Sequence, residues 1–331
     1  MPTSPWLSRI LTVNLVMQVL IVVTGGLVRL TGSGLGCPSW PQCEPGSYTP
    51  TFQTADGIHP YIEFGNRMVG ILVGVVALAT LVAVLRWGRS RPLPLLAGLV
   101  LVGPLAQGVL GGITVRTGLH PATVMAHFLI SMALVGTSTL LVWQVRAGWR
   151  PPARAFAVGP GALVARRLGM ATAAVAAVVL VLGTMVTGAG PHSGDAGDPA
   201  RLGLDPRTLS WLHADSVMIF CGLVIAMLIT THLVPALAPS RRPWEVVLGV
   251  TVAQGLVGYL QYALGLPVAL VSLHMLGATL LTLALTWALR SLLATTCSDQ
   301  RQVQQRVERH REEDQREIAD REVEQPHRAQ L

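Results

Sequence analysis

Long apolar segments separated by short polar stretches run through almost the whole chain. Eight of them reach about 20 residues, the length that an α-helix needs to cross the hydrocarbon layer at a rise of about 1.5 Å per residue. The predicted transmembrane helices lie roughly at 8–29, 62–86, 93–115, 121–145, 167–189, 209–234, 243–264 and 268–293. The first is longer than a typical signal-peptide core and no small-residue cleavage pattern follows it, so we expect it to be retained.

The composition agrees with this pattern and excludes a soluble protein. Hydrophobic residues make up 51% of the 331 residues, charged residues make up 12%, and the mean hydropathy is +0.53. Soluble domains carry about 25% charged residues. We therefore expect an all-α integral membrane protein.

The distribution of the basic residues predicts the orientation in the membrane, and every one of them is arginine. If the N-terminus is cytoplasmic, one face collects twelve arginines and the other only four, namely Arg29, Arg116, Arg201 and Arg207. By the positive-inside rule, both termini are then cytoplasmic. The net charge of +7 follows largely from this topology, so we expect no nucleic-acid partner.

An internal repeat divides the predicted helices into two sets of four. A shift of 147 residues places 106–127 on 253–274 with nine of 22 positions identical, including a glutamine and a histidine 20 residues apart. Because four helices separate the copies, both run in the same direction across the membrane, as in parallel repeats. The repeat predicts two four-helix bundles side by side.

The repeat also sets the domain organisation. The first half is 1–146, with a long outer loop, and a proline-containing cytoplasmic linker follows at 147–166. The second half is 167–293, and 294–331 is a charged cytoplasmic tail, either a mixed-charge helix or disordered. We assign no chemistry to the tail.

Four repeat-related positions near the outer ends of their helices are the strongest candidates for chemistry. His127 matches His274, and the same shift places Asn66 opposite His213. Each half thus offers two positions of similar depth on different helices, which suits two axial ligands of a haem iron. The alternatives are a histidine that bonds a neighbouring helix, or a zinc or copper site, which would need further ligands.

Glu63 is a second candidate, because it lies three residues before Asn66 and shares its helix face. A carboxylate at this position suits proton handling beside the first-half pocket. The alternatives are a salt bridge with Arg67 or a favourable charge at a helix start. The repeat counterpart, Ser210, has no carboxylate, so the two halves are expected to differ in function.

The outer face carries two further candidate features. Cys37 and Cys43 lie in the first outer loop, in a compartment that permits disulfides; the alternative is a metal-binding thiol pair. Arg29 and Arg116 lie at the same face and could bind acidic haem propionates. Ordinary interfacial snorkelling is the alternative for these two arginines.

Several of these motifs together resemble the bacterial haem A synthase family over about 10–293. They are the run from Gly25 to Pro41, Glu63 to Arg67, Gln107 to His127, and the pair His213 and His274. The resemblance implies a bacterial cell-membrane enzyme of eight helices in two homologous halves. It implies oxidation of the C8 methyl of haem O to a formyl group, giving haem A, by two hydroxylations and loss of water.

The resemblance also implies roles for individual residues. His213 and His274 would be the axial ligands of a bound b-type haem, His127 a ligand of the substrate haem, Glu63 the catalytic carboxylate, and Cys37–Cys43 a disulfide. Asn66 departs from the family, where many members have histidine. Substrate haem would then be held by His127 alone, or His59 or His120 would reach in.

The expected partners are a haem O synthase, terminal oxidase assembly factors and an electron donor that the sequence does not identify. Two other functions stay open: a b-type cytochrome for electron transfer, and a haem transporter or chaperone. Electron transfer alone leaves Glu63 and the unequal halves unexplained, and transport gives no reason for a lasting histidine pair.

Overall fold

The computed structural model describes residues 4–51, 57–88, 92–146, 160–192, 194–195, 197, 200–292 and 315. Within these residues, eight helical segments are long and apolar enough to cross a membrane, which confirms a multi-pass membrane protein. Their bounds are α1 Pro5–Leu30, α2 His59–Trp87, α3 Pro92–Arg116, α4 Pro121–Arg146, α5 Pro160–Ala189, α6 Pro206–Leu233, η1 Pro235–Ser240 with α7 Arg241–Ala263, and an eighth helix Val268–Leu292. The described residues contain isolated β-bridges and no strand.

Proline marks where most of these helices begin. It is the first residue of α1, α3, α4, α5 and α6, and the second residue of α2. Proline suits a helix start because its fixed φ is already helical and its missing N–H would have no partner there. This explains why α5 begins at Pro160, inside the predicted linker 147–166, rather than at 167. The rest of that linker and nearly all of the predicted tail lie outside the described residues.

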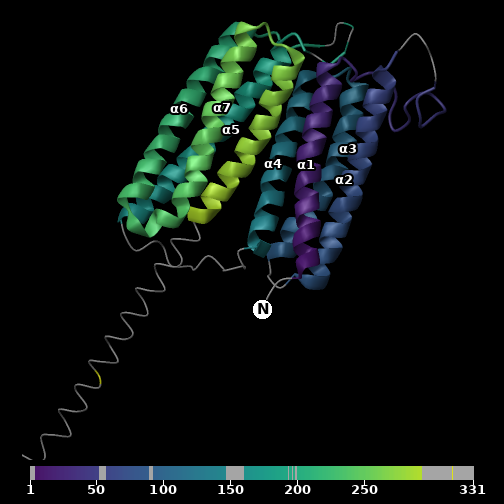
Figure 1. Ribbon diagram of the computed structural model, residues 1–331. Helices are drawn as coiled ribbons and strands as arrows, with labels where there is room; N and C mark the ends of the chain where they lie inside the picture. Colours follow the sequence, from purple (N-terminus) through teal and green to yellow (C-terminus); the bar gives the residue numbers. More distant parts are fainter. Residues whose placement is uncertain are drawn as a thin grey trace, which may run out of the picture.

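The first four helices form a closed ring. α1 packs against α2 and α4, and α3 packs against the same two helices. Their shared apolar core, which we call the first core, is drawn from all four: Leu7, Leu11, Ala77, Ala83, Val84, Leu93, Ala97, Val100, Leu141 and Val145. Figure 1 shows α1 to α4 lying together, with the loop between α1 and α2 at the end opposite to the N-terminus.

The remaining helices share a second apolar core. α5 packs against α6, and α6 against α7. This second core includes Ala165 of α5, Phe220, Val224 and Met227 of α6, Trp244 and Val247 of α7, and Ala284, Leu285, Ala288 and Leu292 of the eighth helix. The division into two parallel-repeat four-helix bundles stays a prediction.

The repeat is visible in the turns that follow α3 and α7. Gly118 and Leu119 have φ of 60° and 60°, and Gly265 and Leu266 have φ of 73° and 62°. In each turn the leucine N–H donates to the carbonyl of the residue five positions earlier, at 2.9 and 2.7 Å. A left-handed leucine is uncommon, so its recurrence 147 residues later indicates that both halves use the same turn.

The two halves are hydrogen-bonded to each other at one end of the helices, which we call the loop face because it carries the α1–α2 connection. The opposite end, where α1 begins, is the terminal face (Figure 1). At the loop face Arg29 donates to the backbone carbonyls of Thr187 and His192 at 2.9 and 2.8 Å. The backbone N–H of Gly34 donates to Gly194 O at 2.7 Å. These bonds fix the first-half loop against the second half.

Candidate functional site

Each of the four repeat-related positions faces a glycine on a neighbouring helix. A Cβ built on each glycine would lie 3.2 to 4.0 Å from the side chain concerned. The pairs are Gly25 with Asn66, Gly111 with His127, Gly183 with His213, and Gly258 with His274. The helices can therefore approach closely beside each position, and a larger residue would push against the side chain opposite.

The 147-residue shift aligns only two of these glycines. Gly111 and Gly258 are 147 residues apart and appear as an identity of the repeat. Gly25 and Gly183 are 158 residues apart, because the connection between the first and second helix of each half differs in length. Aligning α1 with α5 separately from the later helices would have found this second pair.

In the second half, His213 and His274 face one another. Their ring centroids are 6.4 Å apart and the ring planes meet at 75°. Two imidazoles on opposite sides of one metal ion, with metal–nitrogen bonds of about 2 Å, place their centroids about 6 Å apart. The spacing of this pair therefore fits two axial ligands of one iron.

The hydrogen bonds of these two histidines also fit the ligand role. His213 Nδ1 lies 3.1 Å from Val179 O, the contact by which a ligating histidine usually fixes its tautomer and leaves Nε2 free. His274 Nδ1 is buried and has no hydrogen-bond partner among the described residues. Within the described residues no group of three or more His, Cys, Asp and Glu could hold a metal ion, whereas a haem iron needs only two axial ligands from the protein.

A glutamine fixes the backbone of the histidine in each half. Gln107 Nε2 donates to His127 O at 2.8 Å, and Gln254 Nε2 donates to His274 O at 2.9 Å. This shared bond joins the third helix of each half to the fourth at the level of the histidine. It gives a physical reason for the repeated glutamine that the sequence comparison found without explaining.

Asn66, the odd member of the four, is tied to α1. Its Oδ1 accepts a hydrogen bond from Thr24 Oγ1 at 2.8 Å. The amide oxygen is thus already engaged by a neighbouring helix.

The two other histidines considered for the first half also have hydrogen-bond partners. His59 Nδ1 lies 2.8 Å from Ser33 Oγ. The exposed side chain of His120 accepts a hydrogen bond from the backbone N–H of Ala122 at 3.3 Å and so caps the start of α4.

Glu63 is buried, at 5% exposure, and both of its carboxylate oxygens are engaged. Oε1 accepts from Arg67 Nη2 at 2.6 Å and from Nε at 3.2 Å. Oε2 accepts from the backbone N–H of Cys37 at 2.7 Å. The salt bridge that the spacing allowed is therefore present, and Glu63 also holds the loop that contains the cysteines.

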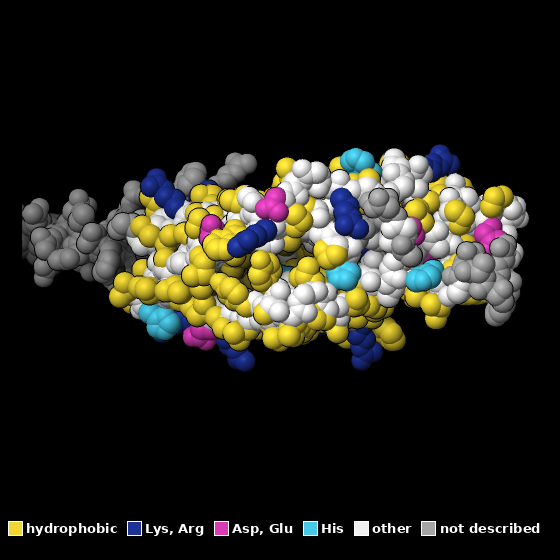
Figure 2. Space-filling model, turned by 90° about the horizontal axis from the view of Figure 1, so that it is seen from above, with side chains coloured by type: hydrophobic (Ala, Val, Ile, Leu, Met, Phe, Trp, Pro, Cys, Tyr) yellow, Lys and Arg dark blue, Asp and Glu magenta, His cyan; other side chains and the backbone are white. Residues whose placement is uncertain are grey.

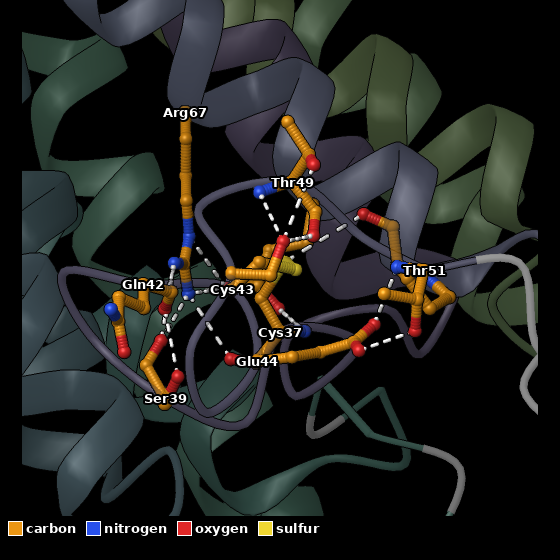
Figure 3. Close-up of a disulfide and its surroundings, with 11 residues drawn as sticks. Cys37, Ser39, Gln42, Cys43, Glu44, Thr49, Thr51 and Arg67 are labelled. Atoms are coloured by element: carbon orange, nitrogen blue, oxygen red, sulfur yellow. Dashed lines mark hydrogen bonds and ion pairs between the residues drawn. A yellow bond between two sulfur atoms is a disulfide. The ribbon is translucent and has the colours of Figure 1, made fainter.

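The Cys37–Cys43 disulfide predicted from the sequence is present, with both residues fully buried. Around it, the guanidinium of Arg67 donates to the carbonyls of Cys37, Ser39 and Gln42 at 3.1 to 3.2 Å (Figure 3). The start of α2 and the disulfide loop therefore form one hydrogen-bonded unit. The sequence signalled Arg67 only as a partner of Glu63, because its loop contacts depend on the fold of residues 25 or more positions away.

The two candidate propionate-binding arginines both bond backbone carbonyls at the loop face. Arg29 holds the α5–α6 connection, as described above. Arg116 donates to Trp40 O at 3.2 Å, and its guanidinium carbon lies 6.0 Å from the Trp40 ring centroid. Figure 2 shows this end of the molecule, where basic, acidic and histidine side chains are interspersed among apolar ones.

Comparison with known proteins identifies a family for this chain. The sequence profile of the cytochrome oxidase assembly protein family matches residues 8–197. The chain is 33% identical over 140 residues to a haem A synthase of Geobacillus thermodenitrificans, covering 41% of this chain and 42% of that protein. It is 34% identical over 147 residues to the haem A synthase of Bacillus mycoides and 36% identical over 148 residues to that of Bacillus cereus, covering 42% of this chain and 44% of each relative. The matches thus span less than half of the relatives' length.

Proposed function

The chain belongs to the family of cytochrome oxidase assembly proteins that includes the haem A synthases, and we propose that it oxidises the C8 methyl group of haem O to the formyl group of haem A. The carbon loses two hydrogens and gains one oxygen overall. Two successive hydroxylations, each with dioxygen as oxidant and two electrons from a donor, followed by the loss of one water molecule, give this balance.

The observation that carries the proposal is the facing pair His213 and His274. Their 6.4 Å centroid separation and the contact of His213 Nδ1 with Val179 O, which directs iron binding to Nε2, support a permanently bound b-type haem in the second half. When bound, such a haem supplies one-electron transfer to and from the substrate site. The glycines opposite the two rings let the neighbouring helices approach closely without a side chain that would push against the imidazoles.

The first half suits a haem that enters, reacts and leaves. His127 would bind the substrate iron on one side. Asn66 faces the other side with a neutral amide whose oxygen is engaged by Thr24, and an amide is a poor iron ligand. A single protein ligand holds the substrate less tightly than two, which favours release of the product.

Glu63 would act as the proton acceptor beside the substrate. Burial opposes the charged carboxylate, whereas the ion pair with Arg67 and the hydrogen bond from Cys37 N–H favour it. A charged carboxylate close to the loop face can take a proton from a reacting group when one of these bonds loosens. The disulfide loop would thereby keep Glu63 in position.

A membrane b-type cytochrome is the second candidate function, because the histidine pair alone would suffice for electron transfer. The unequal halves favour the enzyme, since an electron carrier gains nothing from replacing a histidine by Asn66. A haem transporter or chaperone would tolerate unequal halves but has no use for a lasting histidine pair.

We place the protein in the bacterial cell membrane with both termini in the cytoplasm, so that the loop face lies outside. The arginine distribution supports this orientation, and the similar haem A synthases are bacterial. Haem O synthase would supply the substrate, and assembly factors of a terminal oxidase would receive the product. Arg29 and Arg116 are candidates for contacts with haem propionates.

The test is co-expression with a haem O synthase in a host that makes no haem A, followed by extraction and separation of the haems. Haem A is expected with the native chain and should disappear with His274→Ala and with Glu63→Ala. His232→Ala is the matched control, because the His232 side chain is exposed and its ring nitrogen lies 2.9 Å from Leu228 O of its own helix, a contact that the first-half and second-half sites do not share. Unchanged haem O beside a folded, haem-loaded protein would exclude the proposed activity.

A further inference from the structure

Buried polar side chains form a row inside the first four-helix group, and the proposed chemistry does not use them. Asn14 and Gln18 of α1, Thr80 of α2 and Ser138 of α4 are each at most 2% exposed. Asn14 Nδ2 donates to Ser138 Oγ at 3.0 Å. Buried polar groups within a membrane are costly unless they are hydrogen-bonded, so this row needs a physical explanation.

Most members of the row have an atom without a partner. Asn14 Oδ1, Gln18 Nε2 and Thr80 Oγ1 are buried and make no hydrogen bond to the described residues. The same holds for Gln107 Oε1 nearer the loop face and Gln144 Oε1 nearer the terminal face. Native structures leave few such groups unsatisfied, and bound water is the usual partner where protein groups do not reach.

The row extends along most of the bundle. Along α1, Gln18 lies six residues from Thr24, the residue that bonds Asn66, which is a step of about 9 Å. Asn14 lies four residues beyond Gln18, which is a further step of about 6 Å. On α4, Ser131 accepts from Gln107 Nε2 at 2.8 Å. Water linked by two hydrogen bonds of about 2.8 Å spans 5 to 6 Å, so each step is short enough for one or two water molecules to bridge.

The row reaches the terminal face through residues of α1 and α4. Thr80 lies three residues from Ala77 and from Ala83, both members of the first core, so its helix face points into the bundle. Beyond it, Arg146 Nη2 donates to Thr12 Oγ1 at 3.0 Å. Arg146 is exposed at the end of α4, so the polar row meets solvent-accessible charge there.

The second half replaces most of this row by apolar residues. The 147-residue shift places Leu285 at the position of Ser138 and Met227 at that of Thr80, and both belong to the second core. Aligning Gly25 with Gly183 places Ala176 at the position of Gln18. Thr172 then matches Asn14, but its hydroxyl donates to Leu168 O at 2.7 Å and needs no other partner.

We propose that the first four helices hold a column of bound water that runs from the level of His127 toward the terminal face, held by Asn14, Gln18, Thr80 and Ser138. Hydrogen-bonded water passes protons along its length, so the column gives the surroundings of His127 an exchange path with the terminal face. That substrate binds beside His127 rests on the proposed function, whereas the presence of the water does not.

The test is brief X-ray radiolysis of the purified full chain in lipid nanodiscs in ¹⁸O-labelled water, followed by mass spectrometry. Radicals formed from bound water label adjacent side chains. Leu11 and Leu141 are the reporters, because they are 1% and 0% exposed and lie three residues from Asn14 and Ser138 on the same helix faces. Met227 and Phe220, at 0% and 1% exposure in the second core, are the controls.

We expect label on Leu11 and Leu141 and none on Met227 or Phe220, although methionine is intrinsically prone to oxidation. Equal absence of label from all four side chains would overturn the proposal. The result does not depend on activity, so a chain that makes no haem A but carries this labelling pattern would refute the proposed function alone.

Variants that copy the second half complete the test. In the double variant Thr80→Met with Ser138→Leu, label on Leu11 and Leu141 should fall to the level of Phe220. Label that persists unchanged in a folded variant would mean that bulk solvent enters the bundle, which contradicts a bound column. If that variant does not fold, Gln18→Ala is the milder alternative. Loss of label from Leu11 and Leu141 would again support the column, and label that persists unchanged would again contradict it.

Discussion

His213 and His274 come from two helices and face each other across a ring-centroid distance of 6.4 Å. Asn66 and His127 hold the corresponding positions in the first half. The second half thus offers two imidazoles where the first offers one imidazole and one amide. This difference is the physical basis for assigning a permanent haem to one half and a transient haem to the other.

The first prediction concerns the ligands. His213→Ala should remove the low-spin absorption of the bound haem, because the iron loses one of its two axial imidazoles. Asn66→Ala should leave that absorption unchanged. Reduced-minus-oxidised spectra of the purified variants measure both effects, and the opposite pattern would mean that the roles of the halves are reversed.

The second prediction concerns the glycine that faces His274. A Cβ at Gly258 would lie 3.4 Å from His274 Cε1, so Gly258→Val should displace the ring and remove most of the bound haem. Gly249→Val is the control on the same helix, because a Cβ there meets nothing within 4 Å. The measurement is the amount of haem per protein, from the pyridine haemochrome, in the two variants. Equal loss of haem in both would point to general damage to α7 and contradict a specific effect on His274.

The third prediction concerns Arg67. Arg67→Ala should destabilise the first half by about 3 kcal/mol, because removing one partner leaves the buried Glu63 carboxylate uncompensated. Arg67→Lys should recover only part of this, since an ammonium lacks the planar set of donors that reaches three carbonyls. Thermal unfolding of the purified variants measures the effect.

Arg86→Ala is the control for this comparison, because Arg86 is exposed in the last turn of the same helix. It should leave the unfolding temperature near that of the native chain. If Arg67→Lys restored the full stability of the native chain, the planar geometry of the guanidinium would have no role, and its positive charge alone would account for the effect.

The fourth prediction concerns the disulfide. Replacing Cys37 and Cys43 by serine removes a short loop closure and should cost about 2 kcal/mol on the chain-entropy model. It should also loosen Glu63, which accepts from Cys37 N–H, and so lower haem A formation more than haem b content. Replacing Cys221, which is a free cysteine in α6, should change neither quantity.

Much of the architecture could be predicted from the sequence because it depends on local pattern. Hydropathy located all eight spans, and proline explains why several helices begin earlier than the apolar runs suggest. The repeat identified Gln107 and Gln254, but only the structure shows that each donates to a histidine carbonyl. Such contacts depend on which helices pack together, and a single sequence does not specify this.

Other parts of the site escaped prediction for the same reason. The interpretation of Arg29 as a propionate contact did not foresee its bonds to Thr187 O and His192 O, which cross between the halves. The 147-residue shift does not align Gly183 with Gly25, and the sequence alone does not place Gly183 against His213. Polar residues such as Gln18 drew no notice, since a lone polar residue in an apolar segment shows neither its burial nor its partners.

The most direct measurement is single turnover of the purified protein with haem O. The chain, loaded with its own haem and supplied with haem O, an electron donor and oxygen, should yield a haem whose mass reflects the replacement of two hydrogens by one oxygen. The product should carry a formyl group by its pyridine haemochrome spectrum, and Glu63→Ala should form none. Haem O recovered unchanged from native protein that retains the His213–His274 haem spectrum would contradict the proposed function.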